Sequence, residues 1–133
     1  MKADEKSVAS ASSADVEAGA GIADETIDDI LRGGLRLCQA RRGYRFTIDS
    51  VILARWAGQA LGSTPVSRAL DVGCGCGIIG LILLYDRAVE SCTAVDIVPA
   101  MVQRCLDNAA RNGLTRRLRA VQGDVRSLGT KRH

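Results

Sequence analysis

Residues 69 to 84 read Ala-Leu-Asp-Val-Gly-Cys-Gly-Cys-Gly-Ile-Ile-Gly-Leu-Ile-Leu-Leu, and this stretch decides the fold. A short apolar run that contains Asp71 leads into alternating glycines and then into an apolar segment of about two helical turns. This order is typical of a strand, a tight loop and a helix, which form the first half of a βαβ unit. Alternating glycines let a loop turn sharply and bring its backbone close to a ligand. The following helix would point free N–H groups toward that ligand.

Two classes of cofactor are compatible with such a loop. Residues 75 to 80 read G-x-G-x-x-G, the pattern of dinucleotide-binding proteins, so the glycines alone allow NAD or FAD. The carboxylate of Asp71, two residues before the first glycine, would repel a pyrophosphate. S-adenosylmethionine carries an ammonium and a sulfonium instead, and a carboxylate stabilises both cations. The pattern Asp71-x-Gly73-x-Gly75-x-Gly77 therefore favours S-adenosylmethionine.

Two further acidic residues follow predicted strands. The β-prone run from Ser91 to Ile97 contains Asp96, whose carboxylate can accept from two adjacent ribose hydroxyls in either cofactor class. A third apolar run, residues 119 to 122, precedes Gly123 and Asp124, and we expect Asp124 to accept a hydrogen bond from an adenine amino group. Acids at the ends of three successive strands are a more specific pattern than any single motif.

Together these residues resemble the class I S-adenosylmethionine-dependent methyltransferases. Asp71 to Gly77 matches their glycine motif, Ala94-Val-Asp96 their ribose acid, and Gly123-Asp124 their adenine-side acid. Upstream, Gly43-Tyr-Arg-Phe-Thr-Ile-Asp-Ser50 is similar to a Gly-aromatic-Arg-Phe-Thr-x-Asp-Ser stretch of the bacterial tRNA (adenine-N6) methyltransferases, which modify the adenine at position 37 of a valine tRNA. The resemblance covers roughly residues 35 to 124.

This resemblance implies a cofactor, a reaction and a partner. The cofactor would be S-adenosyl-L-methionine, the reaction methyl transfer to the N6 amine of an adenine, and the partner tRNA. In the family, the segment that contains Phe46 and Thr47 closes over the cofactor. The implied cofactor-binding residues are Asp71, Gly73, Gly75, Gly77, Asp96, Asp124, Phe46 and Thr47.

One departure from the family concerns the acceptor site. Its members hold the target amine with an Asn-Pro-Pro-Tyr or similar motif at the end of the fourth strand. The only prolines here are Pro65 and Pro99, so the motif is absent and no catalytic residue can be named.

We therefore expect a partial Rossmann-like class I α/β fold over residues 24 to 133, a truncated enzyme that lacks the C-terminal strands. It would have three parallel strands in the order 3-2-1, flanking helices and an N-terminal β-hairpin. The open sheet edge predicts self-association.

Composition limits the remaining possibilities. The net charge is −6 over residues 1 to 31 and +9 over residues 32 to 133, and 15 of the 18 basic residues are arginines. Exposed arginines suit tRNA phosphates, although an ordinary solvated surface explains them equally well. Five cysteines without Cys-x-x-Cys spacing indicate neither a disulfide framework nor a metal site. No apolar run is long enough to span a membrane, and we expect a cytoplasmic protein with a disordered tail over residues 1 to 23.

Two alternatives to a methyltransferase stay open at this point. The first is a fragment of an NAD-binding oxidoreductase, which the G-x-G-x-x-G pattern allows. The second is a non-catalytic basic RNA-binding module.

The remaining segments are assigned from local patterns. Asp24 to Leu31 could form a helical turn, and Leu35 to Phe46 alternates around Arg41-Arg42-Gly43 as in a β-hairpin. The exposed hairpin face would carry Arg36, Arg41, Arg42 and Arg45. A helix from Thr47 or Asp49 to about Ala60 would face the sheet through Leu53, Trp56, Ala57, Ala60 and Leu61. Pro99 would open a helix over residues 100 to 112, with Val102, Cys105, Leu106 and Ala109 as its buried stripe.

Overall fold

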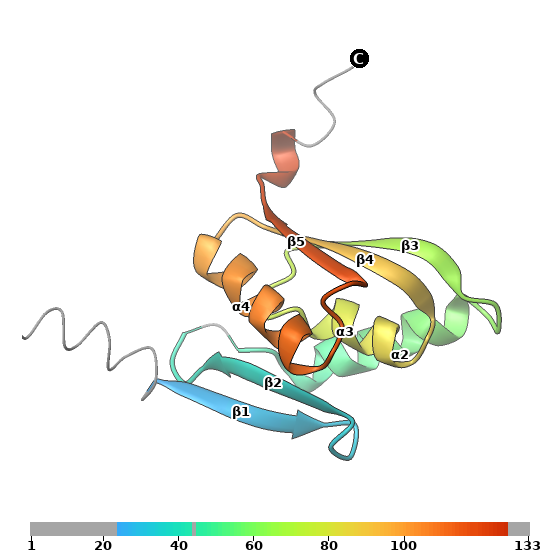
Figure 1. Cartoon of the computed structure of the whole chain (residues 1–133), viewed down its shortest axis with the longest axis horizontal. Helices are drawn as coiled ribbons and strands as arrows, with labels where there is room; N and C mark the ends of the chain where they lie inside the picture. The colour runs from blue at the N-terminus through green and yellow to red at the C-terminus, as the bar shows by residue number, and fades with distance from the viewer. Residues whose placement is uncertain (1–23, 44, 128–133) are drawn as a thin grey trace, which may run out of the picture.

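The computed structural model of the chain describes residues 24–43 and 45–127. The expectation of a disordered tail over residues 1–23 lies outside the described residues. Figure 1 shows the arrangement of the elements. In chain order they are β1 (Glu25–Ile30), β2 (Leu35–Ala40), α2 (Ile48–Ala60), β3 (Val66–Val72), α3 (Ile78–Tyr85), β4 (Val89–Asp96), α4 (Pro99–Arg111), β5 (Leu118–Gln122) and a 3-10 turn at Val125–Ser127.

The central sheet has the predicted topology. Strands β3, β4 and β5 are parallel in the spatial order β3-β4-β5, which places the first predicted strand at one edge. The register pairs Asp71 with Ala94 and Asp96 with Gln122, so the carboxyl ends of the strands meet at one edge of the sheet. The βαβ unit predicted from residues 69 to 84 is therefore confirmed.

The fold is built in three layers. Helices α2, α3 and α4 lie on one side of the sheet, and the β1–β2 hairpin lies beyond them, away from the sheet (Figure 1). Helix α3 is the most deeply buried, and Leu81, Ile82 and Leu84 are completely inaccessible. It contacts the sheet, α2 and β2 at once, which explains why residues 78 to 84 are almost uniformly apolar.

The opposite face of the sheet is partly exposed at β3. Asp71 points toward α3, where it accepts a hydrogen bond from Gly80, so its neighbours point to the other face. Leu70 is 61% and Val72 47% exposed. No described helix covers this face, so the edge strand β3 presents apolar side chains to solvent.

The N-terminal hairpin exists, but only one of its strands, β2, was predicted. The helical turn expected at Asp24 to Leu31 is wrong, because Glu25–Ile30 forms β1, antiparallel to β2. The turn is made by residues 31 to 34, where Gly33 has φ +81° and Gly34 leaves no room for a Cβ beside the Tyr85 ring. These glycines therefore turn a hairpin rather than end a helix.

The second strand of the hairpin expected over Leu35 to Phe46 is also wrong. β2 pairs with β1, and the residues after Ala40 leave the sheet. Arg45, expected on an exposed face, donates hydrogen bonds to the Ala40 carbonyl (2.6 Å) and to Asp28 (3.0 Å). The Arg45 guanidinium thus holds the chain just before α2 against the β1–β2 hairpin.

Helix α2 has the predicted bounds, with Thr47 at its N-cap position and Gly62 (φ +87°) just beyond its end. Its predicted orientation is wrong. α2 packs on α3 instead of on the sheet, and Ala54 is its fully buried residue. Four residues of the expected stripe face solvent: Leu53, Trp56 (65% exposed), Ala60 and Leu61. Only Ala57 of that stripe packs against the core. Helical periodicity therefore did not identify the buried side of α2.

Helix α4 matches its prediction more closely. Pro99 is its first residue, and Gly113 follows its end with φ +70°. Cys105 and Ala109 are buried, and Val102 and Leu106 are half-buried. Within residues 24–43 and 45–127, no helix combines the length and the apolar character needed to cross a membrane.

Candidate functional site

The glycine loop joins β3 to α3 at the carboxyl ends of the strands. Gly73, Gly75 and Gly77 have φ values of +73°, +54° and +92°, a region that side chains disfavour. The N–H groups of Gly73 and Cys74 both donate to the carbonyl of Val95, at 2.8 and 3.0 Å. The loop is thereby tied to the end of the neighbouring strand β4.

Two of these glycines differ in their surroundings. A Cβ on Gly73 would meet no atom within 4 Å, so this part of the loop faces open space. A Cβ on Gly77 would lie 2.7 Å from Sγ of Cys105 on α4, closer than packing permits. Gly73 therefore leaves the backbone accessible, whereas Gly77 allows α4 to approach.

Asp96 holds the loop from the end of β4. Its Oδ2 accepts from the N–H of Gly75 and its Oδ1 from the N–H of Val98, both at 2.9 Å. A carboxylate has about four acceptor positions, so hydroxyl groups of a ligand can still bind here.

A cavity of about 320 Å³ opens beside this carboxylate. Its volume lies within the range of small-molecule sites, roughly 300–1,000 Å³. Apolar side chains, two carboxylates and the guanidinium of Arg126 surround it. The lining residues are Val72, Gly73, Val95, Asp96, Ile97, Gly123, Asp124, Val125 and Arg126.

Asp124 lies across this cavity from the glycine loop, after the end of β5. The side chain of Arg126 donates to both of its oxygens, with Nε 2.9 Å from Oδ1. This hydrogen bonding lowers the pKa of the Asp124 carboxyl below its ordinary value. Asp124 is therefore an ionised acceptor at neutral pH, although Arg126 occupies part of its capacity.

Asp71 is more enclosed and does not line the cavity. Its Oδ2 accepts from the N–H of Gly80 in the first turn of α3, at 3.3 Å. Burial raises the pKa of the Asp71 carboxyl, the Gly80 hydrogen bond lowers it, and the charge of Asp96 raises it further. The interaction with Asp96 shows that these two acids are neighbours, as expected from the sequence. The structure thus brings Asp71, Asp96 and Asp124 to one edge of the sheet.

Phe46 and Thr47 lie elsewhere. Phe46 packs against the core, and its N–H donates to Oε1 of Gln39 at 3.1 Å. Thr47 is exposed at the start of α2 and makes no capping hydrogen bond through its side chain. Neither residue lines the cavity, so their role as cofactor contacts stays a prediction.

Sequence reasoning missed five side chains of the cavity, which are Val72, Val95, Ile97, Val125 and Arg126. Each lies within two residues of Asp71, Asp96 or Asp124, so these acids could have pointed to them.

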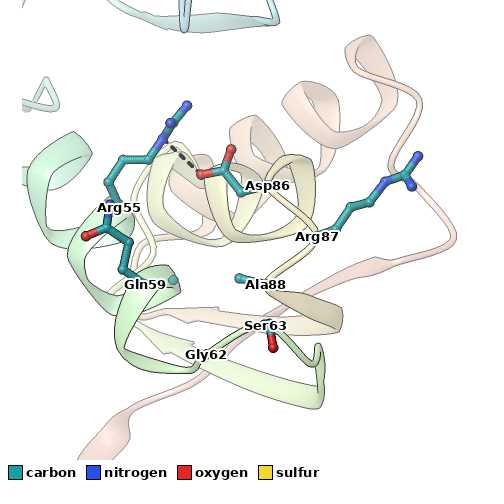
Figure 2. A pocket seen from close by; sticks show the side chains of 8 residues that line it. Arg55, Gln59, Gly62, Ser63, Asp86, Arg87 and Ala88 are labelled. Carbon is teal, nitrogen blue, oxygen red and sulfur yellow. Dashed lines mark ion pairs between the residues drawn. The ribbon is translucent and has the colours of Figure 1, made fainter.

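A second cavity lies away from all predicted site residues (Figure 2). It has a volume of about 350 Å³ and lies between the ends of α2 and α3 and the starts of β3 and β4. Nε of Arg55 is 2.9 Å from a carboxylate oxygen of Asp86, and Arg87 extends away from this ion pair (Figure 2). The size of a cavity alone therefore does not identify the functional site.

Comparisons with known proteins agree with the geometry at the glycine loop. Residues 69–133 match the family model described as "Methyltransferase domain". A "tRNA1(Val) (adenine(37)-N6)-methyltransferase" from a Shewanella strain is 30% identical over 65% of this chain and 34% of its own length. A "Ribosomal protein L11 methyltransferase" from Sorangium cellulosum is 42% identical over 44% of this chain and 18% of its own length.

The solved structure of M. jannaschii TYW2 in complex with AdoMet has a TM-score of 0.65 at 14% identity, covering 78% of this chain and 45% of that one. At this identity the likeness establishes the fold, which is the expected Rossmann-like α/β fold. The chain resembles the class I S-adenosylmethionine-dependent methyltransferases, and the family match covers residues 69–133. It spans about a third of the length of the first curated relatives that it matches.

S-adenosylmethionine, the cofactor of class I methyltransferases, fits the residues present. Gly73 leaves open space beside its backbone, and Asp96 retains acceptor capacity for hydroxyls. The apolar residues Val72, Val95 and Ile97 offer a surface for an adenine ring. Three carboxylates at this edge suit a ligand with two cationic groups and oppose a pyrophosphate.

The raised pKa of Asp71 leads to a stability prediction for this methyltransferase domain. Ionisation of Asp71 is less favourable in the folded protein than in the unfolded chain, so above its folded-state pKa the carboxylate lowers stability. We expect Asp71→Asn to raise the Tm of the ligand-free protein at pH 7, because the amide oxygen can still accept from Gly80. The gain should shrink as the pH falls toward the ordinary carboxyl value of 3.8.

Thermal unfolding followed by circular dichroism from pH 4 to 8 measures this effect. The matched control is Asp107→Asn on the exposed side of α4, which should change stability by less than about 0.5 kcal/mol. A lower Tm of Asp71→Asn at pH 7 would contradict the prediction.

Proposed function

We propose that the chain forms the donor side of a methyltransferase that acts on the N6 amine of an adenine in tRNA. The observation that carries the proposal is the meeting of Asp71, Asp96 and Asp124 beside an accessible glycine loop. The adenine target is supported by the Phe46-Thr47-x-Asp49-Ser50 segment and by the tRNA-modifying relatives.

The matching relatives have different acceptors, a tRNA adenine and a ribosomal protein. The donor region alone therefore does not determine the substrate. Because the Gly43–Ser50 stretch lies outside the glycine loop, it is the part of the chain that favours the tRNA enzymes.

Each acid has a distinct task in this proposal. Asp96 accepts from the ribose hydroxyls while it keeps its bonds to Gly75 and Val98. Asp124, held ionised by Arg126, accepts from the adenine amine. Asp71 attracts the cationic methionine end, and a bound cation would offset the unfavourable ionisation caused by its burial. The cofactor supplies the methyl group, and these residues bind and orient it.

The same acids argue against the dinucleotide alternative. The third glycine of the G-x-G-x-x-G pattern, Gly80, approaches β4 so closely that a Cβ would lie 2.9 Å from Sγ of Cys92. Close packing of helix on strand explains this glycine in either cofactor class. Gly80 therefore does not indicate NAD, and the acidic edge of the sheet disfavours NAD binding.

The surface that would contact tRNA is narrower than the sequence suggested. Arg45 is tied to the hairpin, and Arg117 donates to the carbonyls of Val89 and Glu90, at 2.9 Å each. Both act as structural residues. The exposed candidates for phosphate contact are Arg41, Arg42, Arg116 and Arg119.

The proposal also includes a location and an oligomeric state. Modification of tRNA would place the protein in the cytoplasm. The exposed Leu70 on the edge strand β3 supports self-association, which a monodisperse monomer in sedimentation velocity at high protein concentration would exclude.

Calorimetry with S-adenosylhomocysteine tests the donor site. We expect Asp96→Ala to weaken binding roughly 10- to 100-fold, because it removes the acceptor for two hydroxyls and for the loop amide of Gly75. Glu90→Ala is the control, since it removes an exposed carboxylate from the same strand far from the cavity. Equal affinities of the Asp96 and Glu90 variants for S-adenosylhomocysteine would contradict the proposed function.

Binding of an unmodified valine tRNA transcript at several salt concentrations tests the RNA partner. The double variant Arg41→Ala/Arg42→Ala should weaken binding and reduce the slope of log K against log salt by about 2, because two phosphate contacts are lost. Arg87→Ala, in the cavity of Figure 2, should leave the slope unchanged. An unchanged slope in the double variant would exclude this surface.

A further inference from the structure

One side chain of α4, Asn108, connects three distant parts of the chain. Its Oδ1 accepts from the N–H of Cys38 on β2 at 2.7 Å, and its Nδ2 donates to the carbonyl of the same residue at 2.9 Å. Nδ2 also donates to the carbonyl of Cys76 in the glycine loop, at 3.0 Å. Helix, hairpin and loop therefore share one amide.

The bonding capacity of this amide is completely used. Oδ1 accepts a second hydrogen bond from Nη1 of Arg111 at 3.0 Å, so both acceptor and both donor positions have partners. Asn108 is 0% exposed, so water cannot replace any of these partners. An aspartate has no donor for the two carbonyls, and an apolar residue would leave buried backbone groups unpaired.

The bond to Cys76 is placed where it can control the loop. Cys76 lies between Gly75, whose N–H is held by Asp96, and Gly77, whose N–H donates to the Cys74 carbonyl at 2.9 Å. Gly75 and Gly77 are both in the left-handed region, so the backbone on either side of Cys76 lacks the restriction of a side chain. The Asn108 bond is the contact that fixes this peptide from the helix side.

A neighbouring asparagine supplies an internal comparison. Asn112, the C-cap residue just after α4, accepts from the N–H of Arg36 at 2.9 Å and donates to its carbonyl at 2.7 Å. It thus makes the same two-point contact with β2, two residues from Cys38. Among the described residues, Asn112 makes no hydrogen bond to the glycine loop.

We propose that Asn108 is a positioning residue that sets the glycine loop for the cofactor and couples cofactor binding to the docking of the β1–β2 hairpin. Its amide holds β2 and the loop together, so any shift of the hairpin changes the position of the Cys76 carbonyl. By thermodynamic linkage, a ligand that orders the loop must also order β2. The inference rests on the proposed donor site.

The test compares Asn108→Asp in α4 with Asn112→Asp at its C-cap, the same chemical change one helical turn apart. S-adenosylhomocysteine should bind about tenfold or more weakly to Asn108→Asp, because both donated bonds are lost, and within about twofold of wild type to Asn112→Asp. Equal affinities of the two variants would overturn the proposal.

Hydrogen exchange in the unmodified protein provides the second measurement, which does not depend on the stability of a variant. S-adenosylhomocysteine should slow exchange in the peptide that contains Cys38 as well as in the loop. The Asn108→Asp variant should lose the effect at β2, and Asn112→Asp should keep it, which a merely structural role of Asn108 would not produce.

Loop protection without any change at β2 in the unmodified protein would overturn the coupling and leave the donor site intact. Absence of binding to the unmodified protein would overturn both proposals.

Discussion

The site depends on one carboxylate at the end of the central strand. Asp96 accepts from Gly75 and from Val98, so the glycine loop and the start of α4 are fixed relative to each other by a single side chain. The parallel sheet makes this possible, because it places the ends of β3 and β4 side by side. Without that acceptor, the N–H of Gly75 would lose its partner, and only the bonds from Gly73 and Cys74 to the Val95 carbonyl would hold the loop to β4.

Concentrating acids at this edge is unfavourable without a ligand. Burial and the charge of Asp96 both raise the pKa of Asp71, which shows that the folded chain resists a second negative charge there. Asp124 is stabilised separately by Arg126. An edge that keeps uncompensated negative charge is suited to a cationic ligand. The same electrostatics distinguish an adenosyl sulfonium from a dinucleotide, although both use a glycine loop.

The sequence was sufficient for the features that depend on local chemistry. The glycine positions, the strand order, the bounds of α2 and α4 and the meeting of the three acids followed from motif spacing and from the geometry of parallel strands. The sequence did not predict that β2 pairs with β1 or that α2 packs on α3. Apolar alternation and helical periodicity do not identify which other element packs against a strand or helix. Asn108 escaped notice because its polarity within a buried stripe acquires meaning only when β2, 70 residues away, packs against it.

Mapping of S-adenosylhomocysteine onto the backbone amides by two-dimensional NMR tests the central claim most directly. The largest shift changes should fall on Gly73, Gly75, Ile97 and Gly123, which surround the Asp96 carboxylate. Ser63 and Arg87, in the cavity of Figure 2, should not change. Shifts confined to that second cavity, or spread evenly over the chain, would contradict the assignment of the acidic edge as the cofactor site.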